Sequence, residues 1–169
     1  MAAVTHKLVL PGPVLERGFW LYVWRVETPT GECLYVGRTG DSSSPNATPP
    51  YQRLGQYLGH QPAQNMLRKN LEKKGIKPED CRAFHLIAHG PLFPEAAPKV
   101  MALHKPIPDK VAALEKALAS ALKESGYEVI NTVHCRRPLD AQLFASVLAA
   151  FAVYFPALQH HSDRAVGSP

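Results

Sequence analysis

Aromatic and β-branched residues are concentrated in two short segments near the start of the chain and predict a β-hairpin. Residues 20–27 and 33–37 are rich in Trp, Tyr, Val and Leu, which suit a half-buried pleated surface. Pro29 and Gly31 lie between these segments and favour a turn. Residues 81–88 have a similar composition, so we expect a third strand there.

Apolar residues at helical spacing predict helices between and after these strands. A short helix is expected near residues 50–58 and a longer one over residues 62–74. A later helix is predicted to begin at an N-cap, Asp109, and to stop at Gly126. Its apolar stripe consists of Val111, Leu114, Leu118 and Leu122.

The elements that follow complete the predicted fold class. A strand is expected at residues 127–131, and an apolar helix is expected to start near Pro138. Residues 90–108 contain five prolines and are predicted to form a long connection. We therefore expect an α/β fold in which helices flank a small, mostly antiparallel sheet of three or more strands.

The chain is predicted to form one domain with irregular ends. Its 169 residues are enough for one hydrophobic core, and no shift in composition demands a second. Residues 1–18 are expected to be an N-terminal arm, with an edge strand around residues 7–10. Residues 19–158 would form the domain, including the C-terminal packing helix, and residues 159–169 a flexible tail.

The predicted elements carry several polar side chains that are candidates for catalysis or binding. The hairpin presents two phenols, Tyr22 and Tyr35. Arg53 and Tyr57 are four residues apart, which puts both on one face of a helix. Glu115 projects at the edge of an apolar stripe, where a carboxylate is costly unless it finds a partner.

The order of these residues along the chain is similar to that of a known family. The set comprises Tyr22, Tyr35-Val36-Gly37, Arg53-Leu54, Tyr57, Glu115 and Asn131. It resembles the GIY-YIG nuclease family, whose small domain carries two tyrosine motifs, an arginine on the next helix, a glutamate on a later helix and a final asparagine. The resemblance spans residues 20–131 and implies a GIY-YIG-like sandwich. Trp20 stands in place of the first motif's glycine, and Leu21 and Val36 replace isoleucines, changes that keep strand character.

The resemblance implies a divalent-metal-dependent endonuclease that hydrolyses phosphodiester bonds of DNA, with RNA left open, by in-line attack with one metal ion. Tyr22 would activate the attacking water, and Tyr35 would position the water or the phosphate. Arg53 would bind the non-bridging oxygens. Glu115 would hold Mg²⁺ or Mn²⁺, since a hard, partly hydrated ion suits one carboxylate plus substrate oxygens.

Two further matched positions have supporting roles by the same resemblance. Tyr57 stands where many relatives carry histidine, and it would hydrogen-bond the phosphate or share proton transfer. Asn131 would brace the site. The segment between Gly37 and Arg53 has loop composition and is longer than the family pattern leads us to expect, so it is interpreted as a substrate-contacting insertion.

The charge of the chain favours a polyanionic partner. Its formal net charge is +5 and its pI is near 9.2, and neutralising phosphates releases counterions. Basic residues are concentrated in residues 68–77, on a predicted helix. The candidate nucleic-acid contacts are Arg38, Arg68, Lys69, Lys73 and Lys74. A solvated helix face is the equally weighted alternative.

Cysteine and histidine usage points to neither a disulfide framework nor a zinc site. Cys33, Cys81 and Cys135 are widely separated and form no Cys-x-x-Cys pair, which fits a reducing cytoplasm. His85 and His89 have helix-like spacing, but they fall in a predicted strand and turn, where their side chains would point differently. The N-terminal apolar stretch is too short for a signal peptide.

Two other functions compete with the nuclease interpretation. The same fold could bind nucleic acid without cutting it, with Glu115 merely paired to a lysine or arginine. Alternatively, residues 144–158, which are too short for a bilayer span, could form a packing helix that makes a homodimer of a plain interaction protein. No membrane role is expected.

Overall fold

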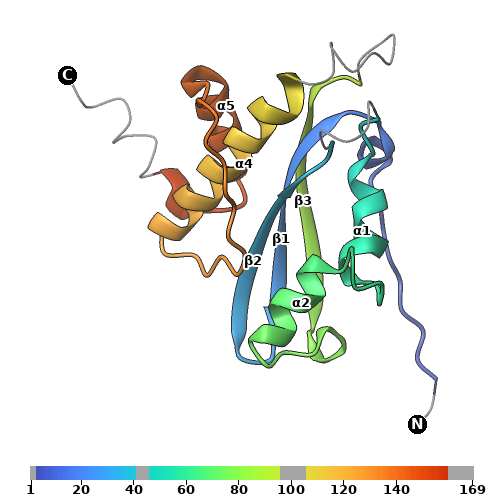
Figure 1. Ribbon diagram of the computed structural model, residues 1–169. Helices are drawn as coiled ribbons and strands as arrows, with labels where there is room; N and C mark the ends of the chain where they lie inside the picture. The colour runs from blue at the N-terminus through green and yellow to red at the C-terminus, as the bar shows by residue number, and fades with distance from the viewer. Residues whose placement is uncertain (1–2, 41–45, 96–105, 160–169) are drawn as a thin grey trace.

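The computed structural model describes residues 3–40, 46–95 and 106–159 and has helices on both sides of a small sheet (Figure 1). The strands are β1 (Phe19–Thr28), β2 (Gly31–Arg38) and β3 (Ala83–Phe93). The α-helices are α1 (Pro50–Leu58), α2 (Met66–Lys73), α4 (Pro106–Glu124) and α5 (Ala141–Ala152). The 3₁₀ turns are η1 (Gly12–Leu15), η2 (Pro78–Asp80) and η3 (Pro156–Leu158). The α/β class with an antiparallel sheet and flanking helices is thereby confirmed.

The sheet has the order β2-β1-β3, and β1 is antiparallel to both neighbours. The predicted hairpin joins β1 and β2, with Tyr22 opposite Gly37 and Trp24 opposite Tyr35. Residues directly opposite each other share a face, and successive residues alternate between faces. The register therefore places Tyr22, Trp24 and Tyr35 on the same face of the sheet.

Helices cover both faces of the sheet, which explains why β1 is buried almost without interruption. On the tyrosine face, the strand residues pack against Leu67 and Leu71 of α2 and against Leu54 and Leu58 of α1. The opposite face packs against α4 and α5 in a larger core. This second core includes Phe19, Leu21, Val23, Leu34, Val36, Val111, Leu114, Leu118 and Leu122.

Two helix starts differ from the prediction. Helix α2 begins at Met66 rather than near residue 62, because the chain first makes a turn in which Gln64 N donates to Gln61 O at 3.0 Å. Helix α4 begins at Pro106, so the assignment of Asp109 as the N-cap was wrong. Proline is tolerated in a first helical turn, where its missing N–H has no partner to lose. Asp109 instead pairs with Arg137 at 3.2 Å.

The strand predictions also need correction. Strand β3 continues to Phe93, so residues 90–93 belong to the sheet and not to the predicted connection. The predicted strand at 127–131 is reduced to one parallel bridge between Val129 and Leu34. Residues 7–10 are exposed and form no strand. Residues 41–45 of the predicted loop, residues 96–105 of the predicted connection and residues 160–169 of the predicted tail lie outside the described residues.

The apolar C-terminal segment forms a packing helix, but this helix runs from Ala141 to Ala152, so residues 153–158 of the predicted helix are not part of it. Asp140 caps α5 by accepting a hydrogen bond from Leu143 N at 3.0 Å. Its buried side chains are Val147, Leu148, Phe151 and Ala152. In the part of the chain that the structure describes, no helix combines the length and hydropathy that a bilayer crossing requires.

Gly37 is required by the close approach of the Tyr22 ring. A Cβ atom at this position would lie 2.4 Å from Tyr22 Cε2 and 2.6 Å from the Tyr22 hydroxyl. Real Cβ atoms do not approach other atoms so closely, and the Tyr22 ring is fully buried in a close-packed interior. The glycine of the second tyrosine motif therefore makes room for the phenol of the first.

We predict that Gly37→Ala lowers the free energy of unfolding by about 1–3 kcal/mol, because the added methyl group forces the Tyr22 ring to move. Urea unfolding measures the effect. Gly55→Ala on α1 is the matched control, because its new methyl group meets nothing within 4 Å, and alanine gains about 1 kcal/mol of helix propensity over glycine. Equal effects of the two substitutions would contradict the steric account.

Candidate active site

Three phenols meet on the face of the sheet covered by α1. The Tyr57 ring on α1 lies with its centroid 6.1 Å from that of Tyr22 and 5.4 Å from that of Tyr35. Tyr22 is fully buried, Tyr35 is 6% exposed, and Tyr57 is half-buried. The hairpin register and the helix packing thus bring together three residues that the sequence separates by up to 35 positions (57 minus 22).

Arg53 lies one turn before Tyr57 on α1 and close to the phenols. Its Nη1 donates to Gln56 Oε1 at 3.1 Å, whereas its Nε is buried and has no hydrogen-bond partner among the described residues. Its positive charge opposes the rise in the pKa of Tyr22 and Tyr35. Because an unpaired buried donor is costly, this N–H is suited to an anionic ligand.

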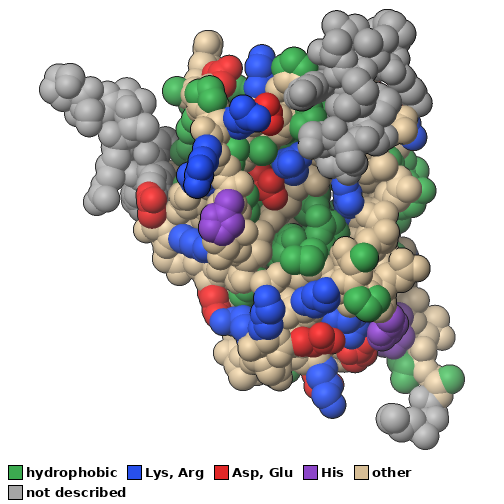
Figure 2. Space-filling view, in the orientation of Figure 1, with side chains coloured by type: hydrophobic (Ala, Val, Ile, Leu, Met, Phe, Trp, Pro, Cys, Tyr) green, Lys and Arg blue, Asp and Glu red, His purple; other side chains and the backbone are tan. Residues whose placement is uncertain are grey.

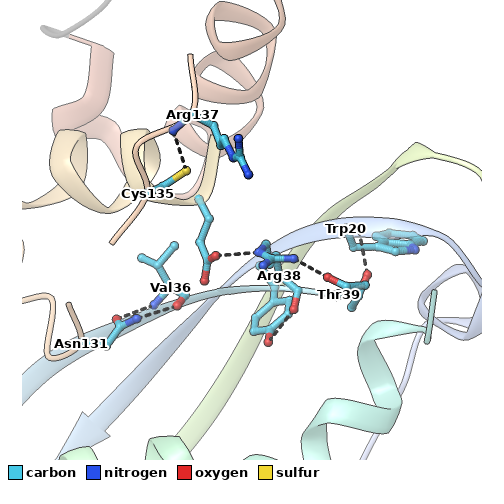
Figure 3. A network of polar contacts seen from close by, with 10 residues as sticks. Trp20, Val36, Arg38, Thr39, Asn131, Cys135 and Arg137 are labelled. Carbon is cyan, nitrogen blue, oxygen red and sulfur yellow. Dashed lines mark hydrogen bonds and ion pairs between the residues drawn. The ribbon is translucent and has the colours of Figure 1, made fainter. Parts of the chain in front are cut away.

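Glu115 finds its partner in Arg38. The Nε of Arg38 donates to Glu115 Oε2 at 3.0 Å, and the two side chains are 24% and 16% exposed (Figure 3). Burial raises the pKa of Glu115 to about 7, and the Arg38 charge limits that rise. The predicted cost of a carboxylate at the edge of the apolar stripe is therefore only partly offset.

Arg38 also connects Glu115 to the phenol cluster. Its carbonyl accepts a hydrogen bond from the Tyr22 hydroxyl at 3.3 Å, and its guanidinium also donates to Gly40 O. The side chain of Arg38 and the ring of Tyr22 lie on opposite faces of the sheet, because Arg38 pairs with Leu21. Arg38, the last residue of the edge strand β2, therefore contacts Tyr22 through its carbonyl and, on the opposite face of the sheet, Glu115 through its side chain.

Asn131 holds the edge of β2 two residues before Arg38. Its Oδ1 accepts from Val36 N at 3.0 Å, and its Nδ2 donates to Val36 O at 2.8 Å (Figure 3). The buried amide thus takes the place of a strand partner and satisfies both backbone groups of one edge residue. This is the contact that a bracing role requires.

The environment of the tyrosines argues against the water-activating role expected for Tyr22. Burial raises the pKa of Tyr22 well above its ordinary value, and Tyr57 adds to the rise. Burial likewise raises the pKa of Tyr35 strongly, with further contributions from Tyr57 and Glu115. A neutral phenol donates a hydrogen bond but is a poor proton acceptor, so both side chains are suited to positioning rather than to base catalysis.

The basic residues predicted on α2 have different surroundings. Arg68 is buried, donating from Nε to Leu58 O at 3.0 Å and from Nη2 to Glu79 Oε1 at 2.6 Å. It joins α2 to its neighbours, so its assignment as a nucleic-acid contact is not kept. Lys69 donates to Pro62 O, and Lys74 pairs with Glu128 at 2.5 Å. Lys73 is exposed.

One face of the molecule is hollowed and carries many basic side chains. Figure 2 shows lysine and arginine side chains around a central hollow in which acidic and hydrophobic side chains are visible. Two of the basic groups at the site, Arg38 and Arg53, are only partly exposed. The Glu115 side chain is 16% exposed, so its carboxylate is also reached from solvent.

The donor set at Glu115 fits a mostly hydrated hard cation. Only Oε2 of the carboxylate has a hydrogen-bond partner among the described residues, which leaves Oε1 for a ligand. Within those same residues, no group of three or more His, Cys, Asp or Glu side chains converges as a metal site. One free carboxylate oxygen suits Mg²⁺ or Mn²⁺ bound largely by water and substrate oxygens, and it does not suit zinc.

Some features of the site could not be found by reading the sequence. The ion pair joins Arg38 to a residue 77 positions later, and no local pattern indicates such a pair. The sequence analysis also did not identify residues 131–137 as a segment beside the site. Two adjacent basic residues shortly after Asn131, Arg136 and Arg137, are the sequence feature that indicates a cationic segment there.

The raised pKa of Glu115 predicts a pH dependence of stability. Between its unfolded pKa near 4.5 and its folded pKa of about 7, the folded protein holds a proton that the unfolded chain releases. The free energy of unfolding should therefore fall as pH rises through this window. From pH 5 to pH 8 the wild type should lose about 2–3 kcal/mol more than Glu115→Gln, in which this group does not titrate.

Metal-free urea unfolding of both proteins at the two pH values gives the comparison. Because the other titrating groups are common to both proteins, their contributions cancel in the difference. Parallel pH profiles of wild type and variant would contradict the buried-carboxylate account.

No family model, no curated protein and no solved structure matches this chain. The likeness in its ordered polar residues therefore remains a resemblance, and the function has to be argued from the site.

Proposed function

We propose that this protein is a GIY-YIG-type, divalent-metal-dependent endonuclease that hydrolyses phosphodiester bonds of DNA. The observation that carries the proposal is that Tyr35, in contact with Tyr57, interacts electrostatically with both Arg53 and Glu115. Among the described residues, the buried Nε of Arg53 has no hydrogen-bond partner, and only one carboxylate oxygen of Glu115 has one. RNA has the same reacting group and is the alternative substrate.

Arg53 supports the recognition of a phosphate. Its buried Nε has no partner among the described residues, and the guanidinium fork matches the geometry of phosphate oxygens. The surrounding apolar side chains lower the local dielectric constant and so strengthen its attraction for an anion. Arg53 would stabilise the charge that builds up on the phosphate during in-line attack.

Glu115 supports the binding of one Mg²⁺ or Mn²⁺ ion through its Oε1, which has no hydrogen-bond partner among the described residues. When bound, the metal supplies a Lewis acid that neutralises charge on the phosphate and makes a coordinated water more acidic. Arg38 already balances the charge of the carboxylate, so an incoming cation and Arg38 repel each other. Arg38 would then turn from Glu115 to the substrate phosphate, an anion that replaces its lost partner.

The phenols position the reactants in this scheme. Tyr35, at 6% exposure, and the half-buried Tyr57 would donate hydrogen bonds to the phosphate or to the attacking water. Tyr22 would act without touching the substrate, because its hydroxyl donates to Arg38 O and so fixes the end of β2. Asn131 fixes the same strand from its other side.

A nucleic-acid-binding module without nuclease activity is the second candidate. The Arg38–Glu115 ion pair favours it, because that pair accounts for the glutamate without any metal. A dimer formed by α5 has less support. The larger apolar side chains of the helix itself are used in the core, and small residues such as Ala145, Ser146 and Ala149 are exposed. The large apolar residues exposed next to it are Val153 and Tyr154, directly after its end.

Nicking of supercoiled plasmid DNA tests the nuclease. We expect cleavage that requires Mg²⁺, stops on chelation, and falls at least about 100-fold in Glu115→Gln, since a lost metal contact is worth several kcal/mol. Glu32→Gln makes the same chemical change at the exposed hairpin turn and should cleave like the wild type. Chelator-resistant cleavage, or equal rates in the two variants, would overturn the mechanism. Salt-sensitive binding without cleavage would favour the binding module.

A further inference from the structure

A short segment after Asn131 runs back along α4 and is attached to it at regular intervals. We call residues 131–137 the basic strap. Lys123 Nζ donates to Asn131 O at 3.1 Å, and Lys116 Nζ donates to Cys135 O at 3.0 Å. At the strap's far end, Arg137 Nε lies 3.2 Å from Asp109 Oδ2. The strap therefore runs antiparallel to α4.

The spacing of the helix partners explains this attachment. Asp109, Lys116 and Lys123 are seven residues apart on α4, so successive side chains differ by only about 20° around the helix axis. They form one seam, with about 10 Å between neighbours along the axis. These contacts position the strap backbone relative to α4.

Alternation along the strap determines which side chains face solvent. Val133 and Cys135 are half-buried, and Val133 packs against the larger core. Thr132, His134 and Arg136 are exposed. Arg136 has no ion pair or hydrogen bond with any described residue, whereas Arg137 is engaged with Asp109. The strap has no acidic residue in its sequence.

The basic strap lies beside the candidate active site. It begins at Asn131, which is bonded to Val36 of β2. Lys116, whose amine supports the strap, is the neighbour of Glu115 in sequence. Figure 3 shows Cys135 and Arg137 on the same side of the sheet as Arg38 and the carboxylate that it contacts. Arg53 approaches the site from α1, on the other face of the sheet.

We propose that the basic strap contacts the sugar-phosphate backbone of duplex DNA beside Glu115, with Arg136 as the principal contact. This inference rests on the proposed function and identifies a surface that holds the substrate. A duplex carries a dense row of phosphates, and an exposed arginine that pairs with no described residue contacts one of them without first breaking an ion pair to those residues. An acidic peptide would lack that regular array.

The salt dependence of DNA binding tests the contact. Fluorescence anisotropy of a labelled duplex is measured in EDTA, so that no cleavage occurs, over a series of KCl concentrations. The slope of log K against log salt should become shallower by about 0.9 in Arg136→Gln, as expected for one lost phosphate contact. Affinity should fall uniformly for unrelated sequences, because phosphate contacts carry no base readout.

Arg82→Gln is the matched control. It removes the same charge from an exposed arginine that forms an ion pair with Glu27. Glu27 lies six residues along β1 from Leu21, the residue that pairs with Arg38. At strand spacing this places it roughly 20 Å from the site. Its slope should equal that of the wild type. Thermal midpoints of both variants check that the fold is intact.

The outcomes separate this inference from the proposed function. A shallower slope in Arg136→Gln alone supports the strap contact. An unchanged slope in Arg136→Gln, or the same change in both variants, overturns it even if metal-dependent nicking is observed. If the wild type neither binds DNA nor nicks it, the proposed function fails, and the strap contact fails with it.

Discussion

The register of the β1–β2 hairpin is the constraint on which the rest of the site depends. Tyr22 lies opposite Gly37, so its ring packs over a residue that has no side chain to obstruct it. The Tyr22 hydroxyl can then donate a hydrogen bond to Arg38 O. A shift by one residue would send every side chain of β2 to the other face. Tyr35 would then leave the phenol cluster, and Arg38 would leave Glu115. Asn131 secures this register from the outside by bonding Val36.

The charged groups of the site are only partly neutralised by one another. Glu115 is half satisfied by Arg38, and burial leaves its pKa near 7. Arg53 has a buried donor without a partner among the described residues. A phosphate with a divalent cation would satisfy both sides together, which neither an anion nor a cation alone would do. The basic strap adds a further cationic surface beside this pair.

The sequence was sufficient for the hairpin, the tyrosine pair and the Arg53–Tyr57 spacing, because alternation and helical periodicity are local properties. It was not sufficient for contacts across the fold, such as Arg38 with Glu115. The assigned role of Arg68 did not hold, because composition does not tell a buried guanidinium from an exposed one. Asp109 was misread as a helix cap, because the helix begins earlier, at Pro106, and the actual partner of Asp109, Arg137, is 28 residues away (137 minus 109).

Mn²⁺ binding measured by electron paramagnetic resonance tests the central claim, that Glu115 holds a metal in exchange for Arg38. The wild type should bind one Mn²⁺ ion, and Glu115→Gln should lose that site. Arg38→Gln should bind Mn²⁺ at least about tenfold more tightly than the wild type, because it removes a positive charge that lies 3.0 Å from the Glu115 carboxylate. Equal Mn²⁺ affinity in all three proteins would contradict the account and would leave the ion pair as a purely structural contact.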